Sequence, residues 1–459
     1  MKKLIYSVCI VSLMLSCSTD PEIDYALIKG QVDNPKTEII TIFKGREKLK
    51  EIVITQDGSF ADTLRVSDGY YGLSHGNESS SVYFAPGYDL NITFNTQEFD
   101  ESIRYEGAGS QINNYLAQKY LEHEKAVGDV PAYYSLDESD YAEKALAMKN
   151  MDLQALENAG ITDQKFIDLE TDNLKYEHFN ILNKYESYHA YYAKKDGFKV
   201  SDDFLPAEIK TMAFDDEQTY TQIPSYNSLA NSQMSDKIYE AIGDDYQNAR
   251  VDHFDVLAQA KIPALKNDII SGMGSFLVSP ANPNMADLYN FFIENLSDED
   301  IKAKLTEKFN RNKNLMKGMP SPQFTQYENH KGGTTSLVEL KGKYVYIDVW
   351  ATWCAPCIRE VPYLKEIESS YHDRNIEFVS TSIDKAADHN KWIDMVKDKS
   401  LGGIQLFADN DWNSKFIKDY AIEGIPRFIL VDPDGNIVSA DAPRPSNPKL
   451  VKLFEALKL

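Results

Sequence analysis

The feature that most constrains the fold is a pair of cysteines three positions apart, placed between an apolar run and a helix. The sequence at 353–357 is WCAPC, and it follows the run 343–349, which has the length and composition of a buried strand. In a first helical turn, residues i and i+3 place both sulfurs on one face, within the Cα separation of about 4.4–6.8 Å that a disulfide permits. This order of strand, cysteine pair and helix indicates an α/β fold around the cysteines.

Both thiols lie where a helix N-terminus favours the thiolate. Free N–H groups and a partial positive charge lower the pKa of such a cysteine from about 8.5 to about 3.5–7.5. The first cysteine of such a motif is the more exposed, so we expect Cys354 to attack a disulfide. Cys357, one turn into the helix, should then resolve the mixed disulfide. A bridge between residues so close closes almost no loop, which favours a redox role over a structural one.

Other uses of the motif are not supported by the sequence. A c-type haem site needs histidine after the second cysteine, but residue 358 is isoleucine. A structural zinc site needs four ligands, and neither a second cysteine pair nor ligand spacing at His330 and His372 is present. The lone peroxidatic cysteine of a peroxidase, in its threonine-containing loop, is also missing. We therefore predict a redox-active dithiol with no metal and no cofactor.

The N-terminus has the pattern of an export signal. A basic start, Met1–Lys3, precedes the apolar run 4–15, which is shorter than the roughly 20 residues that span a bilayer and suits a secretory signal. Ser16-Cys17 then resembles the bacterial lipobox, although Met14 stands where leucine is usual. We predict a signal peptide at 1–16, lipidation of Cys17 and a tether at 17–25. A plain secretory signal and an uncleaved short anchor remain as alternatives.

The mature protein is expected to keep two free thiols, those of Cys354 and Cys357. Cys9 lies inside the predicted signal, and Cys17 would carry lipid. No later stretch is long and apolar enough to cross a membrane, so the rest of the chain is expected outside the cytoplasm. A formal charge of -23 argues against nucleic acid as a partner. It also argues against electrostatic docking on an anionic membrane, so lipid on Cys17 is the expected membrane contact.

Three kinds of pattern follow one another along the exported chain, which predicts a multidomain protein. Residues 26–107 contain short β-branched runs separated by turn signals, typical of an antiparallel β-sandwich or barrel. Residues 108–315 have helical spacing of apolar side chains. After a proline-rich boundary at 318–322, strands and helices alternate through 318–459, which predicts an α/β domain with a mixed sheet.

The motif region also resembles a known family. The sequence VYIDVWATWCAPC at 345–357 is similar to the thioredoxin superfamily, in particular its TlpA/ResA-like branch of exported thiol–disulfide oxidoreductases. The resemblance covers about 318–459 and implies a thioredoxin-like fold, with 386–412 as the extra helix and strand of that branch. Residues 26–120 resemble, more weakly, a β-rich domain often fused to such thioredoxins.

The resemblance assigns two carboxylates to the site. Asp348, six residues before Cys354, matches the buried acid of thioredoxins. Burial should raise its pKa, and it could take the proton of Cys357 through a water. Its alternative is an ordinary strand acid satisfied by a backbone group. Glu360, followed by Pro362 at the TlpA-like positions, resembles the active-site glutamate of the branch, and its alternative is a solvated helix acid.

The resemblance also assigns a substrate-binding face. Pro426 stands where the family keeps a cis-proline against the dithiol. If Pro426 is cis, the Ile425 backbone is free to pair with an extended substrate peptide as an added strand. Trp353 and Pro356 complete the predicted substrate contacts, with the Trp353 ring supplying apolar packing around the dithiol.

The expected function is a lipid-anchored thiol–disulfide oxidoreductase of the bacterial envelope, facing the periplasm or the surface. The resemblance implies reduction of exported protein disulfides, for example during cytochrome complex assembly or as antioxidant activity, and a membrane reductant that restores the dithiol. An oxidase role stays open because the potential depends on thiolate stabilisation. The alternative is an envelope scaffold lipoprotein in which the thioredoxin-like domain is not the main activity.

Overall fold

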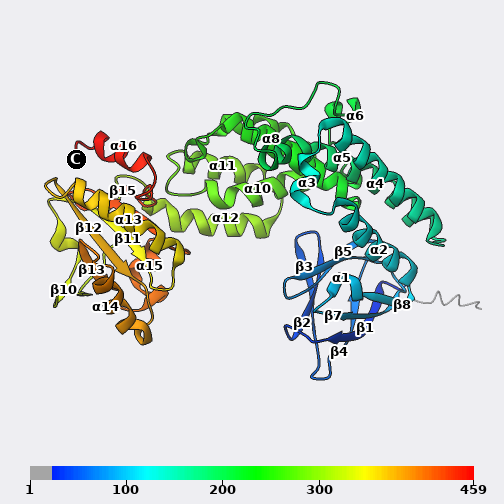
Figure 1. Cartoon of the computed structure of the whole chain (residues 1–459), viewed down its shortest axis with the longest axis horizontal. Helices are drawn as coiled ribbons and strands as arrows, with labels where there is room; N and C mark the ends of the chain where they lie inside the picture. The colour runs from blue at the N-terminus through cyan, green and yellow to red at the C-terminus, as the bar shows by residue number, and fades with distance from the viewer. Residues whose placement is uncertain (1–22) are drawn as a thin grey trace, which may run out of the picture. The chain divides into compact units, whose positions relative to one another are not determined.

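The computed structural model describes residues 23–459 (Figure 1). Segment contacts divide the chain into two compact units. The first runs up to Ala213 and includes Gln218–Leu229, and the second comprises Phe214–Glu217 and Ala230–Leu459. The division falls inside the predicted helical region. The predicted signal peptide, Cys17 and most of the tether lie outside the described residues.

The first unit begins with two four-stranded sheets that share an apolar core. One sheet has the order β4-β1-β7-β8, with bounds β1 (Tyr25–Asp33), β4 (Ser59–Arg65), β7 (Asp89–Asn95) and β8 (Arg104–Ala108). The other has the order β3-β2-β5-β6, with bounds β2 (Ile39–Lys44), β3 (Glu47–Val53), β5 (Gly69–His75) and β6 (Glu78–Phe84). This is the expected sandwich with one correction: β1 and β7 pair in parallel. The chain between them is long enough for the crossover that a parallel pair needs.

Helix α2 (Ser110–Val127) closes an open edge of each sheet. The side chain of Asn113 accepts from the backbone N–H of Tyr83 on β6 at 2.7 Å and donates to its carbonyl at 3.0 Å. Asn114 makes the same pair of bonds with Tyr105 on β8, at 3.1 and 2.7 Å. Both strands are edges of their sheets, so the two amides occupy backbone groups that would otherwise be open to another strand.

Among the described residues, the first unit contains five further helices before the chain reaches the division between the units. Their bounds are α1 (Phe99–Ser102), α3 (Val130–Ser135), α4 (Glu138–Asn158), α5 (Gln164–Tyr192) and α6 (Ala207–Thr211). Two further helices, α7 (Glu217–Gln222) and α8 (Pro224–Ile242), lie in the chain where the units divide.

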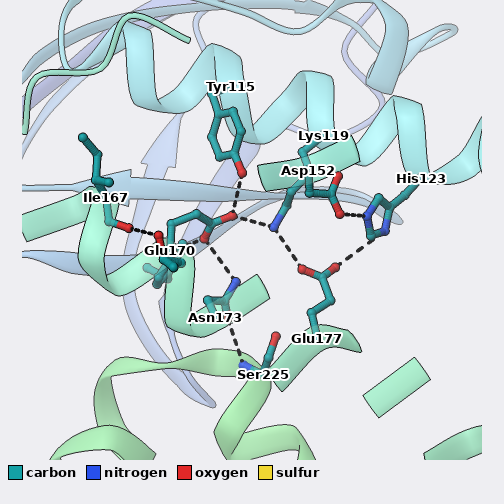
Figure 2. Close-up of polar contacts among 11 residues, drawn as sticks. Tyr115, Lys119, His123, Asp152, Ile167, Glu170, Asn173, Glu177 and Ser225 are labelled. Atoms are coloured by element: carbon teal, nitrogen blue, oxygen red, sulfur yellow. Dashed lines mark hydrogen bonds and ion pairs between the residues drawn. The ribbon is translucent and has the colours of Figure 1, made fainter. Parts of the chain in front are cut away.

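A buried charged cluster joins α2 to α5 (Figure 2). The fully buried carboxylate of Glu170 accepts from Lys119 Nζ at 2.8 Å, Tyr115 Oη at 3.1 Å and Asn173 Nδ2 at 3.1 Å. Lys119 also bonds to Glu177 at 3.1 Å. These partners offset the desolvation of the buried charges, so the cluster fixes the spacing of the two helices without an uncompensated ion.

The second unit starts with helices and ends in a sheet. Its first helices are α9 (Asp255–Gln259), α10 (Pro263–Leu277), α11 (Met285–Asn295) and α12 (Glu299–Asn312). Short 3-10 segments are η1 (Tyr246–Asn248), η2 (Val251–Phe254), η3 (Lys313–Leu315), η4 (Leu337–Leu340), η5 (Ala386–Asp388) and η6 (Asp411–Asn413).

The C-terminal sheet has seven strands in the order β10-β9-β13-β12-β11-β14-β15. Their bounds are β9 (Tyr327–Asn329), β10 (Thr334–Thr335), β11 (Tyr344–Trp350), β12 (Ile376–Ser382), β13 (Ile404–Phe407), β14 (Arg427–Val431) and β15 (Ile437–Ser439). Strands β11, β12 and β13 run parallel, and β14 runs antiparallel to β11, as the prediction of a mixed sheet requires.

Helices cover both faces of this sheet. Helices α13 (Ala355–Ser370) and α16 (Lys449–Ala456) pack on one face around the buried Tyr346 ring. Helices α14 (His389–Asp398) and α15 (Lys415–Asp419) pack on the other face with Ile347 and Val349. A fully buried aromatic or aliphatic side chain contributes about 1.5–3 kcal/mol relative to an exposed one. The predicted fold class, from N-terminal sheets through central helices to a thioredoxin-like α/β domain, is confirmed.

Candidate active site

The cysteine pair lies between β11 and α13, as the sequence predicts. Cys354 caps α13, and its Sγ accepts from the backbone N–H of Cys357 at 3.2 Å. The two sulfurs are bonded to each other with a Cα separation of 5.3 Å. Pro356 occupies the first helical turn, where its missing N–H leaves no helix bond unmade.

The two cysteines do not differ in exposure as expected. Cys354 is 3% exposed and Cys357 is 4% exposed in this disulfide form. Both sulfurs are joined in the disulfide and both residues belong to the same apolar core cluster, which accounts for their equal burial. The assignment of Cys354 as nucleophile therefore depends on its place at the helix N-terminus, where an amide hydrogen bond and the helix dipole favour a thiolate.

The loop before the cysteines is held by a carboxylate that was not predicted from the sequence. Asp384 is fully buried and accepts from Thr352 N at 2.9 Å, Thr352 Oγ1 at 2.7 Å and Ser382 Oγ at 2.7 Å. It lies two residues after the end of β12, at the same sheet edge as the dithiol loop, because β11 and β12 are parallel. An acid just after the strand-like run 376–383 was the available signal in the sequence.

The predicted proline loop meets the dithiol loop. The Ile425–Pro426 peptide bond is cis. Strand β14 begins at the next residue, and its register pairs Arg427 with Val349, one residue before the end of β11. Ile425 packs against the core cluster that contains both cysteines. The sheet therefore brings these residues to the edge where Cys354 lies.

Asp348 is buried beneath α13 and lines a small cavity together with Cys357. Ser380 Oγ donates to its Oδ2 at 3.4 Å, and its Oδ1 has no hydrogen-bond partner. Burial raises the pKa of Asp348 to about 8, helped by the charges of Glu368 and Glu360 and opposed by the Ser380 bond. A carboxyl with this pKa holds a proton at neutral pH and can exchange it with a neighbouring thiol.

Glu360 lies on α13, one helical turn after Cys357. Its carboxylate accepts from Ser446 N at 3.0 Å and from Ser446 Oγ at 2.9 Å, in the segment before α16. It does not line the cavity that holds Asp348 and Cys357. The Glu360 carboxylate thus binds the C-terminal segment through Ser446, while its charge still acts on Asp348 beside Cys357.

Four more polar or charged residues line that cavity and were not singled out from the sequence: Lys365, Glu368, Ser380 and Gln405. Glu368 follows Cys357 by eleven residues, about three helical turns, so it shares the cysteine's face of α13. That spacing was the only local signal, since Ser380 and Gln405 are brought in by the sheet.

Within residues 23–459, no group of three or more His, Cys, Asp or Glu side chains is arranged to hold a metal ion. No helix among these residues has the length and hydropathy of a membrane span.

A family model matches the part of the chain that holds the cysteine pair. Residues 316–454 match the family model described as Redoxin. The thiol-disulfide oxidoreductases ResA of Bacillus thuringiensis and Bacillus cereus are 29% and 31% identical over 121 residues. Each alignment covers 26% of this chain and 66% of the relative, so the chain spans just under two thirds of the length of these relatives.

Solved structures match the same part. The thioredoxin domain of a thiol-disulfide oxidoreductase from Bacteroides vulgatus is 29% identical, over 31% of this chain and 98% of that chain, with a TM-score of 0.28. Another Bacteroides vulgatus protein, solved in solution, is 50% identical, over 31% of this chain and 92% of that chain, with a TM-score of 0.28.

Proposed function

Because the chain belongs, through residues 316–454, to the Redoxin family in the TlpA/ResA-like branch of the thioredoxin superfamily, we propose that it is a thiol–disulfide oxidoreductase that reduces disulfides of exported proteins. One observation carries this proposal. A bonded Cys354–Cys357 pair at the start of α13 lies beside a buried carboxyl, Asp348, with an unpartnered oxygen.

The reaction proceeds in two exchanges. The Cys354 thiolate attacks one sulfur of a substrate disulfide, which forms a Cys354–substrate bond and releases the other substrate sulfur as a thiolate. Cys357 then loses its proton and attacks Sγ of Cys354. The 354–357 disulfide forms, the second substrate sulfur leaves, and both substrate thiolates take up protons. Two electrons pass from the enzyme dithiol to the substrate, and an upstream membrane reductant must return them.

Asp348 serves the second exchange. In its ionised form it takes the proton of Cys357, so the resolving step should speed up as the pH rises through its pKa of about 8. In the return half-reaction the protonated carboxyl gives the proton back to Cys357. A carboxyl that is mostly protonated at pH 7 is suited to that return.

Trp353, Pro356 and Ile425 form the proposed substrate-binding face. Trp353 is 56% exposed beside the buried Cys354, and its ring lies 6.4 Å from that of Trp412. Ile425 precedes the first paired residue of β14. An extended substrate segment can pair with the Ile425 backbone and pack its apolar side chains on the Trp353 ring. Pro426 would set the backbone direction of this loop through its cis peptide bond. The bonds of Glu360 to Ser446 do not by themselves support a catalytic role for Glu360.

The proposed location in the cell envelope rests on the N-terminal sequence. The basic start, the short apolar run and Ser16-Cys17 support a lipid-anchored protein of the bacterial envelope. Its partners would then be exported proteins with disulfides, cytochrome c apoproteins among them, together with the membrane reductant.

Trapping with Cys357→Ser tests this proposal. Without Cys357 the Cys354–substrate bond cannot be resolved, so mixed disulfides should accumulate in cells and separate from the protein on reduction. They should sediment with membranes when Cys17 is present and become soluble with Cys17→Ser. The matched control is Cys354→Ser with Cys357→Ser, which should trap nothing. The proposal is wrong if the Cys357→Ser chain collects no more partners than this control and the wild-type chain does not reduce insulin.

A further inference from the structure

A row of polar side chains crosses the parallel part of the C-terminal sheet. The strand registers pair Asp348 of β11 with Ser380 of β12, and Ser380 with Gln405 of β13. All three residues are buried. Neighbours in register point to the same face of a sheet, and the bond from Ser380 Oγ to Asp348 Oδ2 confirms this for the first two. The row lies beneath α13, on the side where Asp348 and Cys357 line one cavity.

The cavity between this row and α13 is narrow. Its volume is about 10 Å³, close to the lower limit for one water molecule. The helix side is lined by one face of α13, from Cys357 through Val361 and Leu364 to Glu368. Glu368 stands at the end of this face, about three helical turns from the cysteine.

Three polar atoms of residues lining the cavity have no hydrogen-bond partner. They are the acceptors Asp348 Oδ1 and Gln405 Oε1 and the donor Trp350 Nε1. Trp350 lies two residues after Asp348 and so faces the same side of β11. Buried polar atoms are almost always satisfied, and one water that donates to both oxygens and accepts from the indole would satisfy all three.

Glu368 lines the cavity at the end nearest Gly402. Its carboxyl lies against Gly402, so close that a Cβ built on Gly402 would come within 2.1 Å of Glu368 Oε2. The carbonyl of Gly402 accepts from Gln405 Nε2 at 2.7 Å. Glu368 and Gln405 therefore both approach Gly402, and the absence of a side chain there leaves room for the Glu368 carboxyl. Unlike Asp348, Glu368 is only half-buried, so it has access to solvent.

We propose that a water in the cavity, held by Asp348 and Gln405 of this row, passes the proton of Cys357 from Asp348 to Glu368, which exchanges it with solvent. This inference rests on the proposed thiol–disulfide exchange and assigns Glu368 as its proton-relay residue.

Neighbouring charged groups shift the pKa of both Asp348 and Glu368. Glu360 and Glu368 of α13 raise the pKa of Asp348, and Tyr346 is the nearest titratable group on its own strand. Burial raises the pKa of Glu368 to about 7, opposed by Lys365 on α13 and by Lys331 in the turn between β9 and β10. Glu368 is thus the stronger acid of the two, so proton transfer to it from Asp348 is uphill by about one pKa unit and is completed when Glu368 releases the proton to solvent.

The step conserves atoms and charge. Cys357 gives its proton to the Asp348 carboxylate and attacks Cys354 Sγ, the Cys354–substrate bond breaks, and the substrate sulfur leaves as a thiolate. The proton on Asp348 passes through the cavity water to the Glu368 carboxylate and from there to solvent, while the substrate thiolate is protonated by solvent.

The test is Glu368→Gln in the full chain, with a disulfide-bonded peptide as the probe. The rate of 354–357 disulfide formation is followed from pH 5 to 10 by rapid mixing. The wild-type profile should show two ionisations, near 7 and 8. Glu368→Gln should lose the lower one, lower the plateau rate about tenfold and shift the Asp348 ionisation downward, since a negative charge is removed. Gly402→Ala, which displaces the same carboxyl but keeps its charge, should also lower the plateau rate while both ionisations remain.

Two controls separate the relay from structural damage. Glu366→Gln changes an exposed acid of the same helix and should leave the profile unchanged. Glu368→Gln in the Cys357→Ser background should leave the first attack by Cys354 unchanged. The relay is overturned if Glu368→Gln keeps the wild-type plateau and both ionisations, a result that leaves the oxidoreductase itself intact. If the wild-type chain forms no 354–357 disulfide with the peptide, the proposed function fails first.

Discussion

Cys354→Ser is expected to reduce the catalysed reduction of insulin disulfides on the order of a thousandfold or more. A serine hydroxyl at this position stays protonated at neutral pH, whereas the thiolate is the attacking species in disulfide exchange. The amide of Cys357 and the start of α13 are arranged around that sulfur, and no other described side chain occupies the cap. The rate is measured as turnover with dithiothreitol as the reductant.

Cys357→Ser serves as the matched control for that loss. It should form the mixed disulfide once per chain and then stop, so turnover is lost while the first attack persists. Equal turnover in Cys354→Ser and the wild-type chain would contradict the assignment of the nucleophile.

Asp348→Asn should remove a pH-dependent destabilisation of the C-terminal domain. The folded-state pKa of Asp348 is raised from 3.8 to about 8 by burial. Below pH 4 the carboxyl is protonated in both states and contributes nothing. Between pH 4 and 8 only the folded state keeps the proton, so the free energy of unfolding falls as the pH rises. The full effect above pH 8 is on the order of 5 kcal/mol.

The measurement is denaturant unfolding at several pH values, followed by tryptophan fluorescence. All four tryptophans, Trp350, Trp353, Trp392 and Trp412, lie in the C-terminal domain, so the signal reports on this domain alone. The stability difference between Asp348→Asn and the wild-type chain should grow by several kcal/mol from pH 4 to pH 9. A difference that stays constant with pH would mean that Asp348 is not the buried acid described above. Asp394→Asn, at an exposed position on α14, is the control.

The features that the sequence predicts correctly are local. The cysteine pair, the start of α13 and the strand before it depend on neighbouring residues, and the mixed α/β sheet follows from the alternation of short segments. The parallel pairing of β1 with β7 could not be predicted, because it depends on which sheet each intervening strand joins.

The rest of the site depends on contacts between distant residues. Ser380 and Gln405 become neighbours of Asp348 only through the strand order β13-β12-β11. Glu360 has a family-like position in the sequence, but Ser446, far along the chain, occupies its carboxylate. The equal burial of the two cysteines also depends on the core cluster that they share, which spacing alone does not give.

The central claim is that Cys354 and Cys357 give two electrons to a substrate disulfide. Its most direct test mixes the reduced chain with one equivalent of a disulfide-bonded peptide, blocks free thiols after acid quenching and identifies them by mass spectrometry. The account predicts that Cys354 and Cys357 become linked to each other while one peptide disulfide per chain gains two thiols. It is contradicted if both cysteines remain free while the peptide is reduced, or if the peptide stays oxidised.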